Sequence, residues 1–271
     1  MNIIKKSFIR LISNFKIPIN YSGLRLETIS LLKYIYSEKE HFPDDGRSFS
    51  GEEYILCFGD SNTFGWNYLY EDSYPFMLEK KIKSNVQKAI SVINLGKGGA
   101  KIEDLTTEFL QHFSIQNKIT AVFNYGLNNI ILDNIAKNYF DKNKSIVNWD
   151  EINKEYFADC SERFLAGYSD ALKKFLEKNV KIIIIGLYKV GSTKVGKRWV
   201  SDKEYLRAQN DILNSFNSKI SKIALDMGAD FIDLWDIFNK YDEEYYLNED
   251  KFHLNRRAYL IIAEKINDIL Y

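Results

Sequence analysis

From residue 51 onward, short apolar runs alternate with longer segments in which apolar residues recur every three or four positions. The short runs are mostly continuous rather than alternating in polarity, which is typical of parallel strands that are covered on both faces. We predict strands over YILCF (54–58), ISVIN (90–94), ITAVFNY (119–125), VKIIIIGL (180–187) and ADFIDL (229–234).

The longer periodic segments predict helices between and after these strands. They lie near 73–84, 102–113, 155–178, 203–227 and 256–270. Strands separated by helices favour right-handed crossovers and a mainly parallel sheet. The sequence therefore predicts an α/β fold, a flavodoxin-like three-layer α/β/α sandwich built on a five-stranded, mainly parallel sheet.

Residues 1–50 differ from this pattern. They contain two helix-like stretches, around 3–14 and 25–37, followed by the loop EKEHFPDDGRSFSGEE, which is rich in turn-forming and charged residues. We interpret residues 1–50 as a helical N-terminal extension, and residues 51–271 as one main domain.

Composition narrows the classes of partner. Lys+Arg and Asp+Glu both total 37, so the formal net charge is zero, and the broad basic surface of a nucleic-acid-binding protein is not expected. No apolar run approaches the roughly 18 residues of a membrane span, and no signal peptide is recognised, so a cytoplasmic location is expected. Neither the two cysteines nor the three histidines have the spacing of metal ligands, so no metal site is predicted. No other cofactor is predicted.

Polar motifs follow the predicted strands, at the edge of the sheet where α/β proteins hold their ligands. They are GDSN (59–62), LGKGGAK (95–101), GLNN (126–129), YKVGSTKVGKRW (188–199) and, before the last helix, NEDKFHLN (248–255). The chemistry is expected to lie in these segments.

Ser61 stands in a glycine-flanked turn directly after a strand. A serine hydroxyl is a weak nucleophile unless a base removes its proton. His253 is the histidine on a loop near the end of the domain, and Asp250 precedes it by three residues, a spacing that lets the carboxylate orient the imidazole. These residues predict a nucleophile, a base and its orienting acid.

An ester-cleaving serine also needs hydrogen-bond donors for the negatively charged tetrahedral intermediate. The backbone N–H of Ser61 is one candidate. Gly98 and Gly99 can bring a second backbone N–H close to a substrate because they carry no side chain. The side-chain amide of Asn128 is the third candidate.

Four blocks, GDS (59–61), NLGKGG (94–99), GLN (126–128) and DKFH (250–253), together resemble the SGNH or GDSL hydrolases, in the block order and spacing of that family, over about residues 54–271. The resemblance implies a flavodoxin-like fold and metal-free hydrolysis of acyl esters or thioesters. It implies that Ser61 is the nucleophile, His253 the base and Asp250 its partner. It further implies that Gly99, or Gly98 if the glycines align one position earlier, completes the oxyanion hole with Asn128.

Three features depart from the family pattern. Asn129 replaces the aspartate of the third block, which bears on the bracing of that loop more than on the reaction. The first block reads GDSN rather than GDSL, and the family does not account for residues 1–50.

Other interpretations of the same residues remain open. Residues 60–62 alone are typical of a turn with a helix cap. A phosphate-binding loop would need the lysine and hydroxyl of G-x-x-x-x-G-K-[ST], which are missing here. A glycosidase would use a carboxylate pair, for which Asp60 and Asp250 are the candidates.

The favoured function is a serine esterase that acts on a small-molecule or glycan ester, with carbohydrate O-acetyl groups as the candidate substrate. Trp66, just after the nucleophile turn, is the candidate substrate contact, and Tyr241, Tyr245 and Tyr246 are further aromatic residues before the histidine loop. One alternative is an acyltransferase that moves the acyl group to a glycan hydroxyl. Another is a non-catalytic binding protein that retains the fold.

Overall fold

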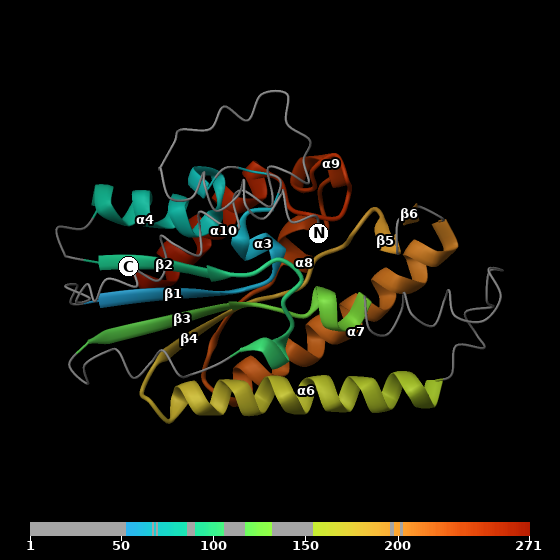
Figure 1. Ribbon diagram of the computed structural model, residues 1–271, viewed down its shortest axis with the longest axis horizontal. Coiled ribbons are helices and arrows are strands. Elements are labelled where there is room, and N and C mark those ends of the chain that lie inside the picture. The colour runs from blue at the N-terminus through green and yellow to red at the C-terminus, as the bar shows by residue number, and fades with distance from the viewer. Residues whose placement is uncertain are drawn as a thin grey trace, which may run out of the picture.

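The computed structural model describes residues 53–66, 68, 70–85, 90–105, 117–131, 154–195, 198–200 and 203–271. Its centre is a parallel sheet of five strands in the order β2-β1-β3-β4-β7, with helices on both faces (Figure 1). This order, with the first strand between the second and third, is that of the flavodoxin-like fold. The predicted fold class is confirmed.

All five predicted strands are present, with ends that shift by a few residues. They are β1 (Glu53–Gly59), β2 (Ile90–Gly96), β3 (Lys118–Asn124), β4 (Lys181–Ile185) and β7 (Asp230–Ile232). In the three central strands, β1, β3 and β4, every residue after the first one or two is buried, because helices cover both faces of the sheet. The edge strand β2 instead alternates buried and half-buried residues.

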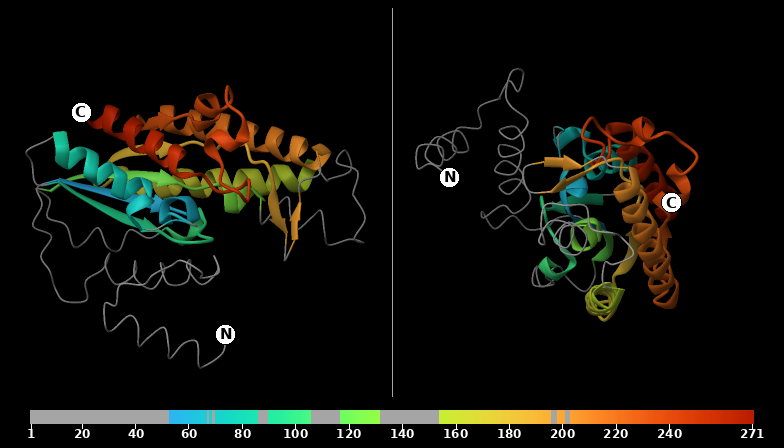
Figure 2. Two further views of the ribbon diagram at one scale, coloured as in Figure 1. Left: turned by 90° about the horizontal axis from the view of Figure 1, so that it is seen from above. Right: turned by 90° about the vertical axis from the view of Figure 1, so that its right-hand side faces the viewer.

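The two helical layers are clearly separated in Figures 1 and 2. One face of the sheet carries α4 (Tyr74–Asn85) and α10 (Arg256–Leu270), and the opposite face carries α6 (Lys154–Leu176) and α7 (Lys203–Asp226). In α6, the buried residues Phe164, Tyr168, Leu172 and Phe175 recur every three or four positions and form one apolar stripe. In α10, the side chain of Asn255 caps the first turn by accepting a hydrogen bond from Ala258 N–H (3.0 Å).

Several short elements are not predicted from the sequence. The stretch after β4 contains an antiparallel pair, β5 (Thr193–Val195) and β6 (Arg198–Val200). A short helix, α3 (Ser61–Phe64), follows β1, and two more, α8 (Leu234–Phe238) and α9 (Glu243–Tyr246), follow β7. One short 3₁₀ turn, η1 (Tyr70–Asp72), precedes α4, and another, η2 (Ile102–Asp104), follows β2. Such short elements carry too few residues to show a periodicity.

Two sequence predictions fall outside the described residues. The first is the N-terminal extension over residues 1–50. The second is most of the helix predicted over 102–113, of which the described part begins with η2.

The carboxyl end of β1 is the point where the strand order reverses, between β2 and β3. Ligands of open α/β sheets bind at such a point, because the loops that leave the neighbouring strands separate there. The backbone is tightly packed at this edge, and an ideal Cβ placed on Gly96 would lie 2.3 Å from Phe64 N and 2.6 Å from the carbonyl carbon of Thr63. The end of β2 therefore presses directly on the backbone of α3.

We expect Gly96→Ala to destabilise the protein by about 3 kcal/mol, because the added methyl group meets backbone atoms that cannot move aside as a side chain can. The matched control is Gly167→Ala in α6, where an added Cβ meets no atom within 4 Å. Alanine is the better helix former by about 0.5–1 kcal/mol, so this control is expected to stabilise the protein. Urea unfolding of both variants would measure the two effects, and equal stability of the two would contradict the prediction.

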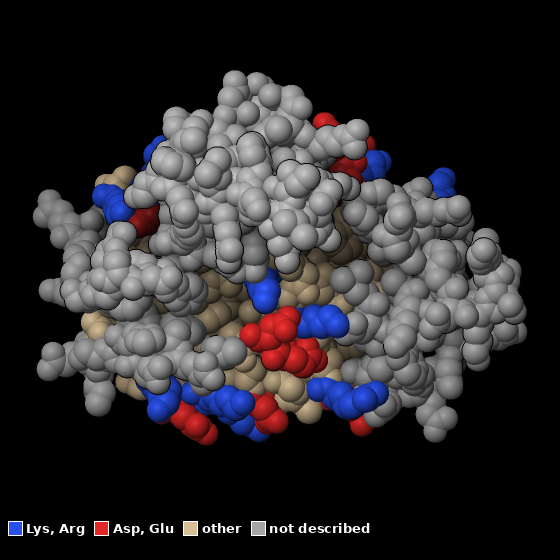
Figure 3. All heavy atoms as spheres, viewed as in Figure 1, with Lys and Arg blue, Asp and Glu red and all other residues tan. Residues whose placement is uncertain are grey.

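Acidic and basic side chains of the described residues are interspersed along the edge formed by α6 (Figure 3). This agrees with the equal totals of the two charge types in the sequence. Among the described residues, no helix has the combination of length and apolar character that crossing a bilayer requires.

Candidate active site

Ser61 is the first residue of α3, directly beyond the end of β1. Asp60 caps this helix, since its carboxylate accepts a hydrogen bond from Asn62 N–H (2.9 Å). Gly65 ends the helix with a φ of 85°, a left-handed conformation that glycine adopts without strain. Burial raises the pKa of Asp60 to about 6, and the hydrogen bond from the Asn62 N–H limits the rise.

The structure brings Ser61, His253 and Asp250 together. His253 Nε2 lies 3.1 Å from Ser61 Oγ, and His253 Nδ1 lies 2.7 Å from Asp250 Oδ2. Ser61 and His253 are buried residues, with 6% and 8% of their surfaces exposed. Their hydrogen bonds are therefore shielded from water, which strengthens them.

Asp250 also organises the loop that carries His253. Its second carboxylate oxygen accepts hydrogen bonds from the backbone N–H groups of Phe252 and His253, both at 2.9 Å. Partial burial of the Asp250 carboxyl raises its pKa, but the hydrogen bond and the charge of His253 and these backbone donors outweigh burial. The net effect is a pKa below the ordinary value. Asp250 is therefore held as a carboxylate that faces His253.

The loop after β4 is hydrogen-bonded to the turn that contains Asp250 and Lys251. Gly191 N–H and Ser192 N–H both donate to the carbonyl of Lys251, at 2.7 and 3.0 Å, and Ser192 Oγ donates to the carbonyl of Asp250. Lys251 has a φ of 53°, which is unusual for a residue other than glycine. The backbone hydrogen bonds hold this conformation in place.

The loops after β2 and β3 contact one another through two asparagines. Asn128 Nδ2 donates to the carbonyl of Ala100 (3.0 Å), the residue after Gly99. Asn129 Oδ1 accepts from Ile102 N–H (3.2 Å) and its Nδ2 donates to Glu103 (2.7 Å). Asn129 thus braces the loop although it replaces the aspartate of the family pattern. The chain places Gly99 and Asn128 on adjoining loops.

Trp66 lies beside the histidine. Its ring is near-parallel to that of His253, with ring centroids 5.8 Å apart. On the loop after β2, a Cβ at Gly98 would contact the Trp66 ring at 3.4 Å, whereas one at Gly99 would meet no atom within 4 Å. Gly98 is therefore packed against Trp66, and Gly99, with a φ of 77°, faces open space.

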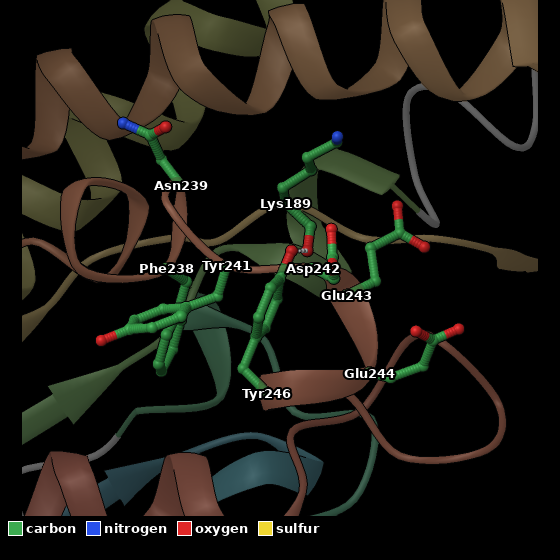
Figure 4. A pocket seen from close by; sticks show the side chains of 8 residues that line it. All are labelled: Lys189, Phe238, Asn239, Tyr241, Asp242, Glu243, Glu244 and Tyr246. Carbon is green, nitrogen blue, oxygen red and sulfur yellow. Dashed lines mark hydrogen bonds between the residues drawn. The ribbon is translucent and has the colours of Figure 1, made fainter.

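The aromatic residues before the histidine loop divide into two groups. Tyr246 is buried, stacks on Phe238 at 4.7 Å between ring centroids and donates a hydrogen bond to the Lys189 carbonyl, so it belongs to the core. Tyr241 is 38% exposed and stacks on Tyr245. Tyr241 and Tyr246 both line a pocket of about 320 Å³ (Figure 4), together with Lys189, Phe238, Asn239, Asp242, Glu243 and Glu244. Glu244 reaches Lys251 Nζ at 3.8 Å, so this pocket adjoins the loop of Asp250.

Sequence reasoning missed the buried polar residues that support the site. Asn62 and Tyr188 hydrogen-bond to each other and to the histidine loop, and Ser192 bonds to Asp250. For Asn62, the signal was its polarity at the fourth position of the GDSN motif. For Tyr188 and Ser192, the only signal was their place after a strand.

Within the described part of the chain, no group of three or more His, Cys, Asp or Glu side chains is arranged to hold a metal ion. The glycosidase interpretation receives no support from the placement of Asp60 and Asp250. Asp60 is buried in the cap of α3, and Asp250 is committed to His253 and to its own turn.

The fold and these contacts define an α/β protein with a hydrogen-bonded serine, histidine and aspartate at the carboxyl edge of its sheet. The profile of the GDSL-like lipase/acylhydrolase family matches residues 57–261. The chain belongs to this family, and membership supports the activity of an ester hydrolase. Among proteins with curated descriptions, none matches the chain by sequence.

Solved structures of esterases share the fold at low identity. The acetyl xylan esterase AlAXEase is 20% identical with a TM-score of 0.55, over 80% of this chain and 100% of that chain. A lipase/acylhydrolase from Enterococcus faecalis is 18% identical with a TM-score of 0.53, over 80% and 95%. The acetylxylan esterase Axe2 from Geobacillus stearothermophilus is 14% identical with a TM-score of 0.52, over 82% and 95%.

Proposed function

We propose that the protein is a serine esterase that cleaves acyl esters through an acyl-enzyme. The observation that carries this proposal is the continuous hydrogen-bonded chain from Ser61 Oγ through both ring nitrogens of His253 to Asp250. Such a chain lets the imidazole accept the serine proton while the carboxylate stabilises the imidazolium that forms.

In the first half of the reaction, Ser61 Oγ attacks the acyl carbonyl carbon and His253 Nε2 takes the hydroxyl proton. The carbon–oxygen bond to the alcohol then breaks, and His253 returns the proton to the departing oxygen. In the second half, His253 takes a proton from water, and the hydroxide attacks the acyl-enzyme. The acid leaves, and Ser61 regains its proton.

The proposed oxyanion donors are the backbone N–H groups of Ser61 and Gly99 and the side-chain amide of Asn128. Gly99 is exposed and faces open space, which leaves room for a substrate oxygen next to its backbone. The Asn128 amide has two N–H donors, and its bond to Ala100 orients the group with one of them. Donors fixed in this way need no reorganisation as charge develops.

The proposed substrate is a small acyl group, such as acetyl, on a carbohydrate. Trp66 packs beside His253 and against Gly98, and we assign it the contact with the substrate. The pocket next to the Asp250 loop is lined by several carboxylates, to which the hydroxyls of a sugar can donate hydrogen bonds. The esterases that share the fold include two described as acetyl xylan esterases.

The test combines turnover with labelling. The purified protein is expected to hydrolyse p-nitrophenyl acetate, and a fluorophosphonate probe is expected to modify Ser61, located by peptide mass spectrometry. Acetylated xylo-oligosaccharides are expected to release free acetate. A folded protein that neither turns over the ester nor reacts with the probe would refute the proposal, and acetate recovered on an added glycan rather than in solution would identify a transferase instead.

A further inference from the structure

Asn62 follows Ser61 directly, and its side chain is fully buried. Its amide oxygen accepts a hydrogen bond from Leu254 N–H (3.0 Å), and its amide nitrogen donates to Tyr188 Oη (2.9 Å). The first of these bonds joins residues 192 positions apart. Asn62 therefore ties the turn that carries Ser61 to the residue that follows His253.

Tyr188 completes a second connection to the same loop. Its hydroxyl donates to the carbonyl of Phe252 (2.9 Å), and 1% of its surface is exposed. The residues on both sides of His253 are thus connected to Asn62 by hydrogen bonds. The Leu254 N–H bonds to Asn62 directly, and the Phe252 carbonyl is connected to it through the Tyr188 hydroxyl.

The chemistry of these groups fixes the direction of every bond. The Leu254 N–H can only donate, so it must face the amide oxygen of Asn62. The Phe252 carbonyl can only accept, so the Tyr188 hydroxyl donates there and receives its own hydrogen bond from the Asn62 amide. A leucine at position 62, as in the usual GDSL motif, could satisfy none of these buried groups.

We propose that Asn62 and Tyr188 are positioning residues that set the separation of Ser61 Oγ and His253 Nε2, and thereby the rate of acyl transfer to and from Ser61. Asp250 orients the imidazole from its Nδ1 side, and the Asn62–Tyr188 connection holds the backbone on either side of the ring. The proposal rests on the proposed esterase function, because the rate of proton transfer matters only if Ser61 is the nucleophile.

The first test measures kcat and KM for p-nitrophenyl acetate with Asn62→Ala and Tyr188→Phe. Small displacements of reacting groups can cost about 100-fold in rate, so we expect kcat to fall by about 10- to 100-fold in Asn62→Ala, with KM within about threefold of the unchanged protein. Tyr188→Phe keeps the ring and removes one hydroxyl, and a smaller decrease of about 10-fold is expected. The rate of fluorophosphonate labelling should fall in parallel with kcat.

Asn217→Ala is the matched control. Asn217 is also a buried asparagine with two directional bonds, since its oxygen accepts from Leu187 N–H (2.7 Å) and its nitrogen donates to Asp233 (2.9 Å). These bonds reach neither Asn62 nor the loop of His253. Leu187 directly precedes Tyr188, but the bond holds the Leu187 backbone N–H and not the Tyr188 hydroxyl. Loss of stability similar to that of Asn62→Ala, with kcat within about threefold of the unchanged protein, is expected.

A double-substitution cycle separates positioning from general weakening of the fold. Because Asn62 and Tyr188 act through one connected chain, the Asn62→Ala/Tyr188→Phe protein should be little slower than Asn62→Ala alone. The effects on kcat of Asn62→Ala and Asn217→Ala should instead multiply. Unchanged kcat in both single variants, or an equal loss in Asn217→Ala, would overturn the positioning role. If Asn62→Ala does not fold, kcat of Tyr188→Phe alone tests the positioning role. Absence of turnover and labelling in the unchanged protein would refute the esterase function itself.

Discussion

Replacement of Ser61 by alanine should abolish ester hydrolysis while the protein remains folded. Without the hydroxyl no acyl-enzyme can form, and a decrease in kcat on the order of 10⁶-fold is expected from serine hydrolases in which the nucleophile was removed. The substitution deletes one oxygen atom from a residue that is 6% exposed. Its effect on the free energy of unfolding should therefore stay within about 1 kcal/mol. Turnover of p-nitrophenyl acetate and thermal unfolding would measure the two quantities.

His253→Ala provides the companion measurement. Because nucleophile and base act as one unit, the Ser61→Ala/His253→Ala protein should be no slower than either single variant. The residual rate would then report what the remaining donors contribute alone. A Ser61→Ala protein with undiminished turnover would exclude Ser61 as the nucleophile.

Replacement of Asp250 by asparagine should reduce kcat by about 10⁴-fold, because it would favour the imidazole tautomer of His253 that is protonated on Nε2. One carboxylate oxygen accepts from the backbone N–H groups of Phe252 and His253, so the asparagine oxygen must take that place. The amide nitrogen then faces His253 Nδ1 and donates to it, which leaves the ring proton on Nε2. A protonated Nε2 cannot accept the proton of Ser61.

The turn itself should survive this substitution, because the asparagine oxygen keeps both backbone hydrogen bonds. Asp72→Asn is the control, since Asp72 is a surface acid paired with Arg256 at 2.7 Å, and an unchanged kcat is expected there. An Asp250→Asn protein that keeps more than about a tenth of the activity would contradict the assigned role of Asp250.

The depressed pKa of Asp250 also predicts a pH dependence of stability. A carboxyl whose pKa in the folded protein lies below the ordinary 3.8 contributes stability above that value and loses it as the pH falls through the folded pKa. The difference in stability between the unchanged protein and Asp250→Asn should therefore shrink on acidification below about pH 4. Urea unfolding over a pH series would measure it.

The strands and the long helices could be predicted from the sequence because their patterns of apolar residues are local. The run IIII in β4 is buried on both faces, and the stripe of α6 repeats at helical spacing, so each element carries its own signal. The polar motifs at the strand ends then indicated which residues the fold would gather. The structure places Ser61, His253 and Asp250 within hydrogen-bonding distance, as that reasoning required.

The amino-acid sequence by itself determined the α/β order, the flavodoxin-like sheet and the three residues of the hydrogen-bonded chain. Only the tertiary structure decided that Asn62, which by sequence is the residue next to Ser61, bonds to Leu254 and through Tyr188 to Phe252. The difference has a physical reason. Periodicity arises from neighbours along the chain, whereas a hydrogen bond across 192 positions depends on where distant loops meet.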